Sequence, residues 1–223
     1  MIESVQKMIG FAEQTAADGT FVPGSLGAAM LEAAKRGELG PQQVPLLVFD
    51  YIGPSLDTTI SAIGSAVWLL ATHPDQWAAL RADPSLVPNT FNEVVRVESP
   101  VRLLSRVTTT ATSVAGYDLH AGCRVMVLHA SANRDHRHFE RADEFDITRH
   151  NAGEHIGFGY GLHACAGQGL ARLQSHAVLE ALIAQVDTIE LGEPVRGLNN
   201  LINGFESLPV TVHAARQPAL TPS

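Results

Sequence analysis

Residues 158–167 read FGYGLHACAG, and the helix-like sequence LARLQSHAVLEALI follows at residues 170–183. This order places Cys165 in a glycine-rich loop at the start of a helix. Backbone N–H groups at a helix N-terminus are unpaired and carry partial positive charge. They therefore favour a thiolate, the form of cysteine that binds metals and acts as a nucleophile.

The glycines of this loop leave room beside the backbone. At Gly159, Gly161 and Gly167 a flat group can lie close against the chain, and Phe158 adds the edge of a ring. The loop therefore predicts a site for a large planar cofactor. A buried cysteine in a glycine-rich turn is the alternative interpretation of the same residues.

The composition favours a folded protein of one large or two small domains. Of 223 residues, 45% are hydrophobic and 17% are charged, which supplies a core and argues against disorder. The formal net charge of −8 argues against a protein that binds nucleic acid. Two cysteines make no disulfide framework, and the first residues do not resemble a signal peptide. We therefore expect a cytoplasmic location and no membrane association.

The spacing of apolar residues predicts helices through the first hundred residues. They are expected over residues 1–18, about 25–35, 41–72, 74–81 and from about 91 to just before 100. The helix over 41–72 would be about 45 Å long. Because Pro54 lacks a backbone N–H, we expect this helix to open locally between Tyr51 and Thr58.

The spacing of apolar residues along the sequence changes after Pro100. Short strands are expected over residues 103–114, 116–119 and 124–128, a loop over 132–154, a helix ending near 186, and a terminal β-hairpin over 198–213. The fold class is therefore mainly α (α+β), with a long kinked central helix, small β-sheets and a cysteine loop.

The cysteine loop has the pattern F-x-x-G-x-H-x-C-x-G. This pattern resembles the heme-binding loop of the cytochrome P450 family. The resemblance implies that Cys165 binds the iron of heme b (iron protoporphyrin IX). The loop residues that would surround this cofactor are Phe158, Gly159, His163 and Gly167.

Glu93 and Arg96 are three residues apart in a predicted helix, so their side chains lie on one face and can form a buried pair. A solvated surface ion pair has the same spacing. In the family, an E-x-x-R motif and a third residue, usually basic, form a structural lock on the loop before the cysteine. The resemblance implies that Arg149 is the third residue.

Asp57, Thr58 and Thr59 lie midway along the longest predicted helix, where polar side chains compete with helical hydrogen bonds. By resemblance this is the family's oxygen-binding groove, in which Thr58 would hydrogen-bond dioxygen and Asp57 would connect it to solvent. Pro54 and Ser55 depart from the usual small residue and glycine, which puts the route of dioxygen in doubt. A proline-kinked core helix with satisfied hydroxyl groups is the alternative.

The resemblance also assigns residues outside these motifs. Arg106 and His163 match positions that hold the heme propionates, and His155 would add to that rim. The substrate-facing residues would be Leu103, Leu104 and Phe205, which could equally be core residues.

Together these features imply a heme-thiolate monooxygenase that uses dioxygen to hydroxylate or O-dealkylate a small organic substrate. The sequence around Asp57 resembles bacterial members that oxidise para-substituted benzoic acids. Soluble bacterial members take electrons from a ferredoxin and a ferredoxin reductase, so these are the expected partners.

The order of the motifs matches the second half of a cytochrome P450. Residues 1–223 are therefore expected to be the C-terminal portion of a single cytochrome P450 domain whose N-terminal half is absent. Two alternatives stay open: a truncated, catalytically inactive heme-thiolate fragment, and a cysteine hydrolase that uses Cys165 with His163.

Overall fold

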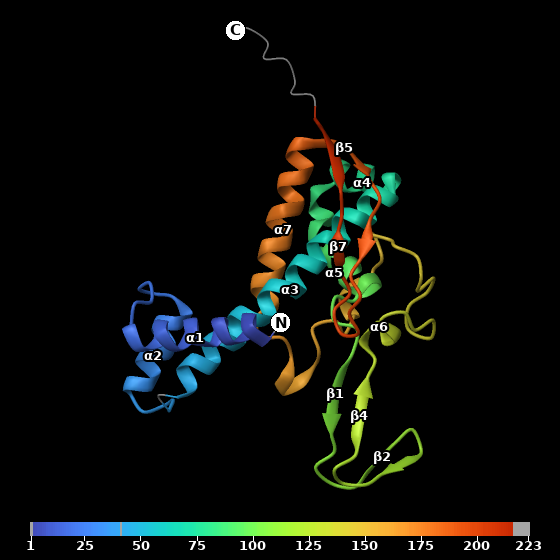
Figure 1. Ribbon diagram of the computed structural model, residues 1–223. Coiled ribbons are helices and arrows are strands. Elements are labelled where there is room, and N and C mark those ends of the chain that lie inside the picture. Colours follow the sequence, from blue (N-terminus) through green and yellow to red (C-terminus); the bar gives the residue numbers. More distant parts are fainter. Residues whose placement is uncertain (1, 41, 216–223) are drawn as a thin grey trace, which may run out of the picture. The chain divides into compact units, whose positions relative to one another are not determined.

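The computed structural model of the protein describes residues 2–40 and 42–215. It divides into two compact units, Met1–Asp57 and Thr58–Ser223, and the division falls inside the longest helix. Helices and strands are labelled in Figure 1.

The first unit is helical. It consists of α1 (Ile2–Asp18), α2 (Leu26–Lys35) and the first part of α3 (Gln43–Thr72). The hydroxyl of Ser25 accepts a hydrogen bond from the backbone N–H of Ala28 at 3.2 Å and so caps α2. Ala12, Val44 and Val48 form a small buried core. The helices predicted for this part are confirmed, except that Pro41 lies outside the described residues.

Helix α3 is α-helical throughout, so the predicted local opening between Tyr51 and Thr58 is wrong. Proline removes one helical hydrogen bond, and a helix of this length keeps the others on both sides. The hydroxyl of Ser55 donates to the carbonyl of Ile52 at 2.7 Å within the same turns of the helix.

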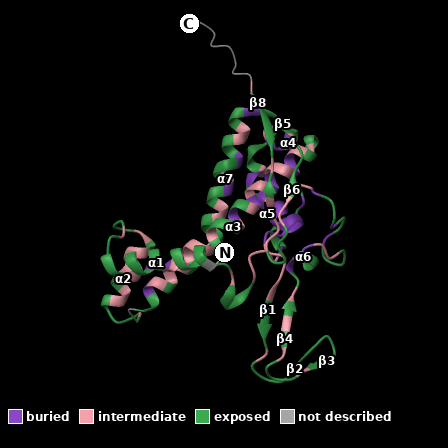
Figure 2. Cartoon of the chain, viewed as in Figure 1, coloured by how far each residue is buried: buried purple, intermediate pink, exposed green. Residues whose placement is uncertain are grey.

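Within the described residues, the second unit contains the rest of α3 and four further α-helices. These are α4 (Pro74–Ala82), α5 (Val87–Glu98), α6 (His129–Ala132) and α7 (Gln168–Gln185). Figure 2 shows that buried residues concentrate on α5. Phe91 and Val94 of this helix are 1% and 0% exposed and join one apolar core with Leu70, Leu80 and Leu179. Helix α5 is therefore the central element against which the neighbouring segments fold.

Within the described residues the strands form four two-stranded antiparallel sheets. The pairs are β1 (Leu104–Val107) with β4 (Arg124–Val127), β2 (Thr112–Val114) with β3 (Tyr117–Leu119), β5 (Val186–Leu191) with β8 (Val210–Ala214), and β6 (Val195–Arg196) with β7 (Phe205–Ser207). The strands between residues 104 and 127 lie where the sequence predicts them.

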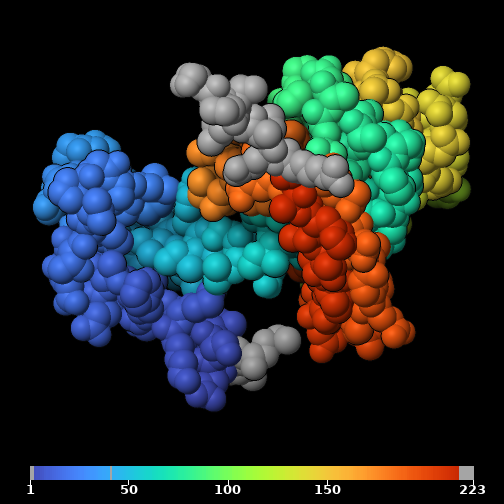
Figure 3. Space-filling view, turned by 90° about the horizontal axis from the view of Figure 1, so that it is seen from above, coloured from blue at the N-terminus to red at the C-terminus, as the bar shows by residue number. Residues whose placement is uncertain are grey.

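The predicted single hairpin over residues 198–213 is wrong. Strand β7 pairs with β6, whereas β8 pairs with β5, which directly follows α7. In Figure 3 these C-terminal strands are orange and red and run beside one another. Pro209 separates β7 from β8, and its carbonyl accepts the backbone N–H of Gly192 at 2.9 Å. That bond directs the chain toward β5.

Candidate functional site

The cysteine loop closes on itself through a backbone hydrogen bond. The N–H of Cys165 donates to the carbonyl of Phe158 at 2.8 Å. Gly159 and Gly161 have φ angles of 71° and 72°, a left-handed conformation that costs other residues about 1–2 kcal/mol. A Cβ atom on Gly159 would also lie 3.3 Å from the carbonyl oxygen of His163. The glycines therefore shape the turn as well as leaving space beside it.

The thiol of Cys165 faces solvent at the start of a helix. Cys165 is exposed and lies two residues before Gly167, the N-cap of α7. Its neighbours Tyr160 and Leu162 are 91% and 102% exposed. These exposures contradict the interpretation as a buried structural cysteine and leave the thiol accessible to a large ligand.

Phe158 anchors the loop from inside. Its ring lies 6.4 Å from that of Phe91 on α5 and 5.6 Å from that of His155, measured between centroids. The guanidinium of Arg172, on α7, lies 5.0 Å from the Phe158 centroid and also donates to Asn92. Two helices thus hold the aromatic side chain that begins the loop.

His155 is a buried, neutral histidine with one unused ring nitrogen. Burial first, and the charge of Arg172 second, lower its pKa to about 4. Its Nδ1 accepts the N–H of Gly157 at 3.0 Å, which leaves the proton of the neutral ring on Nε2. Nε2 is buried and has no partner within the described residues. An unpaired donor close to the cysteine loop fits an acidic group of a cofactor.

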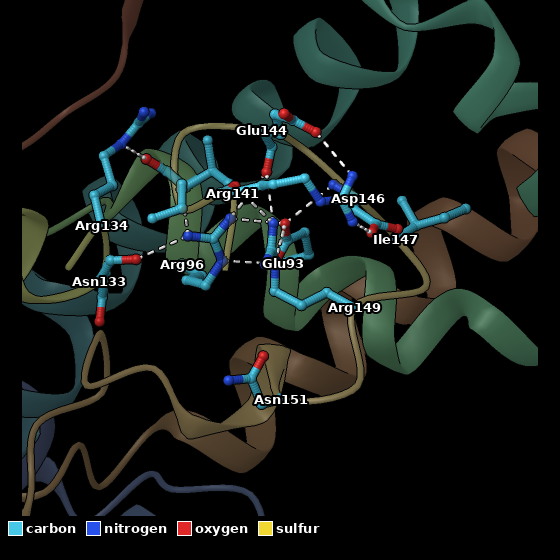
Figure 4. A network of polar contacts seen from close by, with 12 residues as sticks. Glu93, Arg96, Asn133, Arg134, Arg141, Glu144, Asp146, Ile147, Arg149 and Asn151 are labelled. Carbon is cyan, nitrogen blue, oxygen red and sulfur yellow. Dashed lines mark hydrogen bonds and ion pairs between the residues drawn. The ribbon is translucent and has the colours of Figure 1, made fainter. Parts of the chain in front are cut away.

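Glu93 and Arg96 form a completely buried ion pair (Figure 4), since both side chains are 0% exposed. The Nε of Arg96 donates to Oε2 of Glu93 at 2.7 Å, and its Nη2 donates to Oε1 at 2.8 Å. The interpretation as a solvated surface pair is therefore wrong. Burial of both charges is tolerated because the geometry is bidentate and other polar groups complete it.

Arg149 joins the same carboxylate from the loop. Its Nε donates to Oε1 of Glu93 at 3.0 Å, and its Nη2 donates to the carbonyl of Glu144 at 3.1 Å. Arg96 donates to that carbonyl as well, at 3.0 Å. The structure thus brings together the three residues that the sequence assigned to the lock.

Asn133 is a connecting residue that sequence reasoning missed. Its carbonyl accepts from Arg96 at 2.8 Å, its side-chain amide donates to the hydroxyl of Ser99 at 3.0 Å, and its Oδ1 accepts the N–H of Ile156 at 2.8 Å. Asn133 therefore joins α5 to the segment that leads into the cysteine loop. An asparagine in a polar stretch carries no pattern that would have predicted this.

The other predicted site residues are placed individually. Asp57, Arg106 and His163 are exposed, whereas Thr58, Leu103 and Leu104 are half-buried. Phe205 is half-buried, with the guanidinium of Arg196 3.9 Å and the ring centroid of Trp68 5.9 Å from its own ring centroid. Among the described residues no hydrogen bond joins Cys165 to His163. The pair required by the hydrolase alternative is therefore not formed.

These features together are typical of one kind of site. An exposed cysteine at the start of a helix, a loop shaped by left-handed glycines, and a buried histidine donor beside it are features that a thiolate-bound cofactor would require. The Glu93–Arg96–Arg149 network serves to hold the segment that precedes this loop.

Comparison with known proteins identifies the family. The sequence model described as Cytochrome P450 matches residues 1–191, most of the chain. This protein belongs to the cytochrome P450 family, whose members bind heme b.

Relatives and solved structures support the same assignment. The chain is 45% identical over 194 residues to cytochrome P450 CYP199A2 of Rhodopseudomonas palustris, which covers 86% of this chain and 47% of the relative. Identity to cytochrome P450-terp of a Pseudomonas species is 39% over 155 residues, or 69% of this chain and 36% of that one. The chain thus spans about half the length, or less, of these curated relatives.

The fold agrees as well. The substrate-free structure of cytochrome P450 CYP150A6 from Mycobacterium marinum superimposes with a TM-score of 0.86 at 28% identity, covering 96% of this chain and 56% of that one. The predicted fold class, the C-terminal part of the cytochrome P450 fold, is confirmed. None of the helices in residues 2–40 and 42–215 combines the length and the apolar character needed to cross a membrane.

Proposed function

We propose that this protein is a heme-thiolate monooxygenase that uses dioxygen to hydroxylate or O-dealkylate a small organic substrate. The observation that carries the proposal is the exposed thiol of Cys165 at the start of α7, in a loop whose turn is shaped by left-handed glycines. Heme iron bound through a thiolate supplies the oxidising chemistry, because electron density from sulfur favours cleavage of the O–O bond.

The residues of this chain would hold the cofactor in separate ways. Cys165 would bind the metal, and Phe158, Gly159 and Gly167 would line the plane of the ring. The propionates would be bound by Arg106 and His163, which are exposed cations or donors, and by the unpaired Nε2 of His155. Charge-assisted and neutral hydrogen bonds of this kind would orient the propionate-bearing edge of the heme without blocking the thiol of Cys165.

Proton delivery is assigned to α3. Asp57 is exposed and would exchange protons with solvent, and Thr58 would pass them on through its hydroxyl group.

The substrate would be contacted by Leu103, Leu104 and Phe205. A para-substituted benzoic acid is the substrate that we propose, because residues 50–61 resemble those of bacterial enzymes acting on such acids. A ferredoxin and its reductase would supply electrons, and the protein would work in the cytoplasm.

A second candidate is a heme-thiolate fragment that does not turn over alone. Tyr160 and Leu162 beside the thiol are almost completely exposed, as is Leu198 at 104%, and apolar residues at such positions usually have a contact partner. The chain also spans about half of its curated relatives.

The test is the absorption spectrum of the reduced protein under carbon monoxide. We expect the red-shifted Soret band of a thiolate-bound heme in the 223-residue chain, its loss in Cys165→Ala, and its retention in Cys123→Ala. Cys123 is the matched control because it is the second free cysteine and lies in the turn before β4. An identical spectrum in Cys165→Ala would overturn the proposal.

Turnover separates the two candidates. Product formed from 4-methoxybenzoate by the chain with a ferredoxin and its reductase supports the enzyme. Product that appears only after fusion to the N-terminal part of the Rhodopseudomonas palustris relative supports the inactive fragment.

A further inference from the structure

A cavity of about 620 Å³ lies in the second unit, lined by the end of α3, the start of α4, the end of α5 and the loop over residues 134–146. Small-molecule sites usually measure about 300–1,000 Å³, so this volume is sufficient for one organic molecule. Trp68 of α3 and Phe145 of the loop contribute two aromatic rings to the lining. None of the residues that we assign to heme, dioxygen or substrate lines this cavity.

The lining of the cavity carries more negative than positive charge. Its carboxylates belong to Asp75, Glu98, Asp143, Glu144 and Asp146. Its two guanidinium groups are already paired within the loop (Figure 4). Arg134 donates to Asp143 at 3.1 Å, and Arg141 pairs with Glu144 at 2.9 Å and with Asp146 at 3.2 Å. The other two carboxylates therefore have no partner among the cations of the lining.

Glu98, the last residue of α5, has one carboxylate oxygen without a donor. Its side chain is only 7% exposed. Oε2 accepts every hydrogen bond that this carboxylate makes within the described residues, from Arg196 at 2.6 Å and from Ser65 and Asn203 at 3.4 Å each. Oε1 accepts none there. A buried charged oxygen without a donor is costly, so Oε1 is an acceptor available to a ligand in the cavity.

The junction of α3 and α4 adds further acceptors. The Nδ1 of His73 lies 2.8 Å from the carbonyl oxygen of Leu69, which can only accept, so the ring proton of neutral His73 lies on Nδ1 and Nε2 keeps a lone pair. The ring packs against Phe145, with 5.3 Å between centroids. Asp75 is exposed and accepts from the neutral amide of Gln76 at 3.0 Å. A ligand in this cavity would therefore meet acceptors and aromatic rings.

Among the described residues no group of His, Cys, Asp and Glu side chains is arranged to hold a metal ion, so the lining favours an organic cation over a metal. We propose that the cavity binds a small aryl amidinium or guanidinium, whose N–H groups donate to Oε1 of Glu98 and whose ring lies against Trp68 and Phe145. Such a ligand would connect three helices to the loop over residues 134–146. Asn133 joins this loop to the segment before the cysteine loop, so binding would also stabilise that segment.

Three probes of nearly the same shape test the charge preference. Benzamidinium is positive, benzamide is neutral and benzoate is negative. Binding to the 223-residue chain can be followed by NMR through the indole N–H of Trp68, which lines the cavity. The indole N–H of Trp77 is the internal reference, because it donates to the carbonyl of Asp187 at 2.8 Å outside the cavity. We expect benzamidinium to shift the Trp68 signal saturably, and benzamide to bind at least about tenfold more weakly. Benzoate should leave both signals unchanged.

Two substitutions in the lining and one outside it locate the site. Glu98→Gln keeps the shape of the side chain and removes its charge, so the Kd of benzamidinium should rise roughly 10- to 100-fold, the effect of losing a hydrogen bond to a charged group. Asp75→Asn should raise it about two- to fivefold, because this carboxylate is exposed. Glu190→Gln is the control and should not change it. Glu190 pairs with His213 on the surface, and its side chain is 68% exposed.

The titration is made with and without heme, because the cavity shares no residue with the proposed heme site and the result does not depend on the proposed function. Equal affinity for benzamidinium and benzamide, unchanged affinity in Glu98→Gln, or no saturable shift of the Trp68 signal would overturn the site. A shift of the Soret band without a shift at Trp68 would place the ligand on the iron and would overturn it too. If Glu98→Gln does not unfold cooperatively in urea, Asp75→Asn and the three probes decide, and equal affinities throughout would refute the proposal.

Discussion

The buried Arg96 provides a sharp test of the lock. Among the described residues it donates five hydrogen bonds, two to Glu93 and one each to the carbonyls of Asn133, Ala142 and Glu144. The carbonyls of Asn133 and Ala142 have no other donor in that part of the chain. In Arg96→Lys the positive charge stays, but a single ammonium group cannot reach acceptors that the planar guanidinium serves on opposite edges.

The expected loss follows from those two carbonyls. Each buried acceptor left unpaired costs about 1–3 kcal/mol, so Arg96→Lys should lower the free energy of unfolding by about 2–6 kcal/mol. That is a large share of the total for an ordinary domain, about 5–15 kcal/mol. Urea unfolding can be followed by the fluorescence of Trp68 and Trp77, the two tryptophans of the sequence, both in the second unit.

The control is the same substitution at an exposed arginine of the same loop. Arg141 pairs with Glu144 at 2.9 Å and with Asp146 at 3.2 Å, and its side chain is 55% exposed. Exposed pairs contribute about 0–1 kcal/mol, so Arg141→Lys should change stability by less than about 1 kcal/mol. If both variants unfold at the same urea concentration, the buried network does not have the stabilising role that we assign to it.

Three further predictions concern the cysteine loop and α3. Because the pKa of His155 is lowered from 6.5 to about 4, the unfolded chain binds a proton that the folded chain excludes. The neutral ring of this histidine should therefore contribute fully to the free energy of unfolding above pH 6.5. That free energy should fall by about 3 kcal/mol as the pH drops to about 4. His155→Gln should remove that part of the slope in urea titrations, and an unchanged slope would contradict the assignment. Gly161→Ala should cost about 1–2 kcal/mol from backbone conformation, whereas Gly159→Ala should cost more because it adds a close contact; equal losses in thermal unfolding would refute the steric part. Thr58→Ala should divert electrons to hydrogen peroxide, measured per electron consumed, and Thr59→Ala should not; normal coupling in Thr58→Ala would exclude its role in proton transfer.

Local patterns predicted most of the helices and the pair Glu93–Arg96. Helical spacing of apolar residues placed α1 to α5 and α7, and a three-residue separation sufficed to place two charges on one face. These inferences succeed because they depend on residues within one or two turns of each other. The Arg149 partner came only from resemblance to a family, since it lies 56 residues from Glu93.

Contacts between segments far apart in the sequence could not be predicted from local patterns. Strand β8 could pair with β7 or with β5 on local propensity alone, and the choice depends on where α7 ends. Glu98 and Arg196 are 98 residues apart, and neither belongs to a pattern. Pro54 was misjudged for a different reason, because one missing hydrogen bond does not open a helix whose other bonds are intact.

The way in which the 133–149 loop is held has a consequence for the order of folding. Arg96 supplies donors to carbonyls that lie 37, 46 and 48 residues further along the chain. Contacts at such separations close large loops and therefore form late. The native contacts of this segment depend on α5, and Asn133 connects the segment to Ile156, which precedes the cysteine loop. We therefore expect the cysteine loop to become ordered after α5, which pulsed hydrogen exchange during refolding would show.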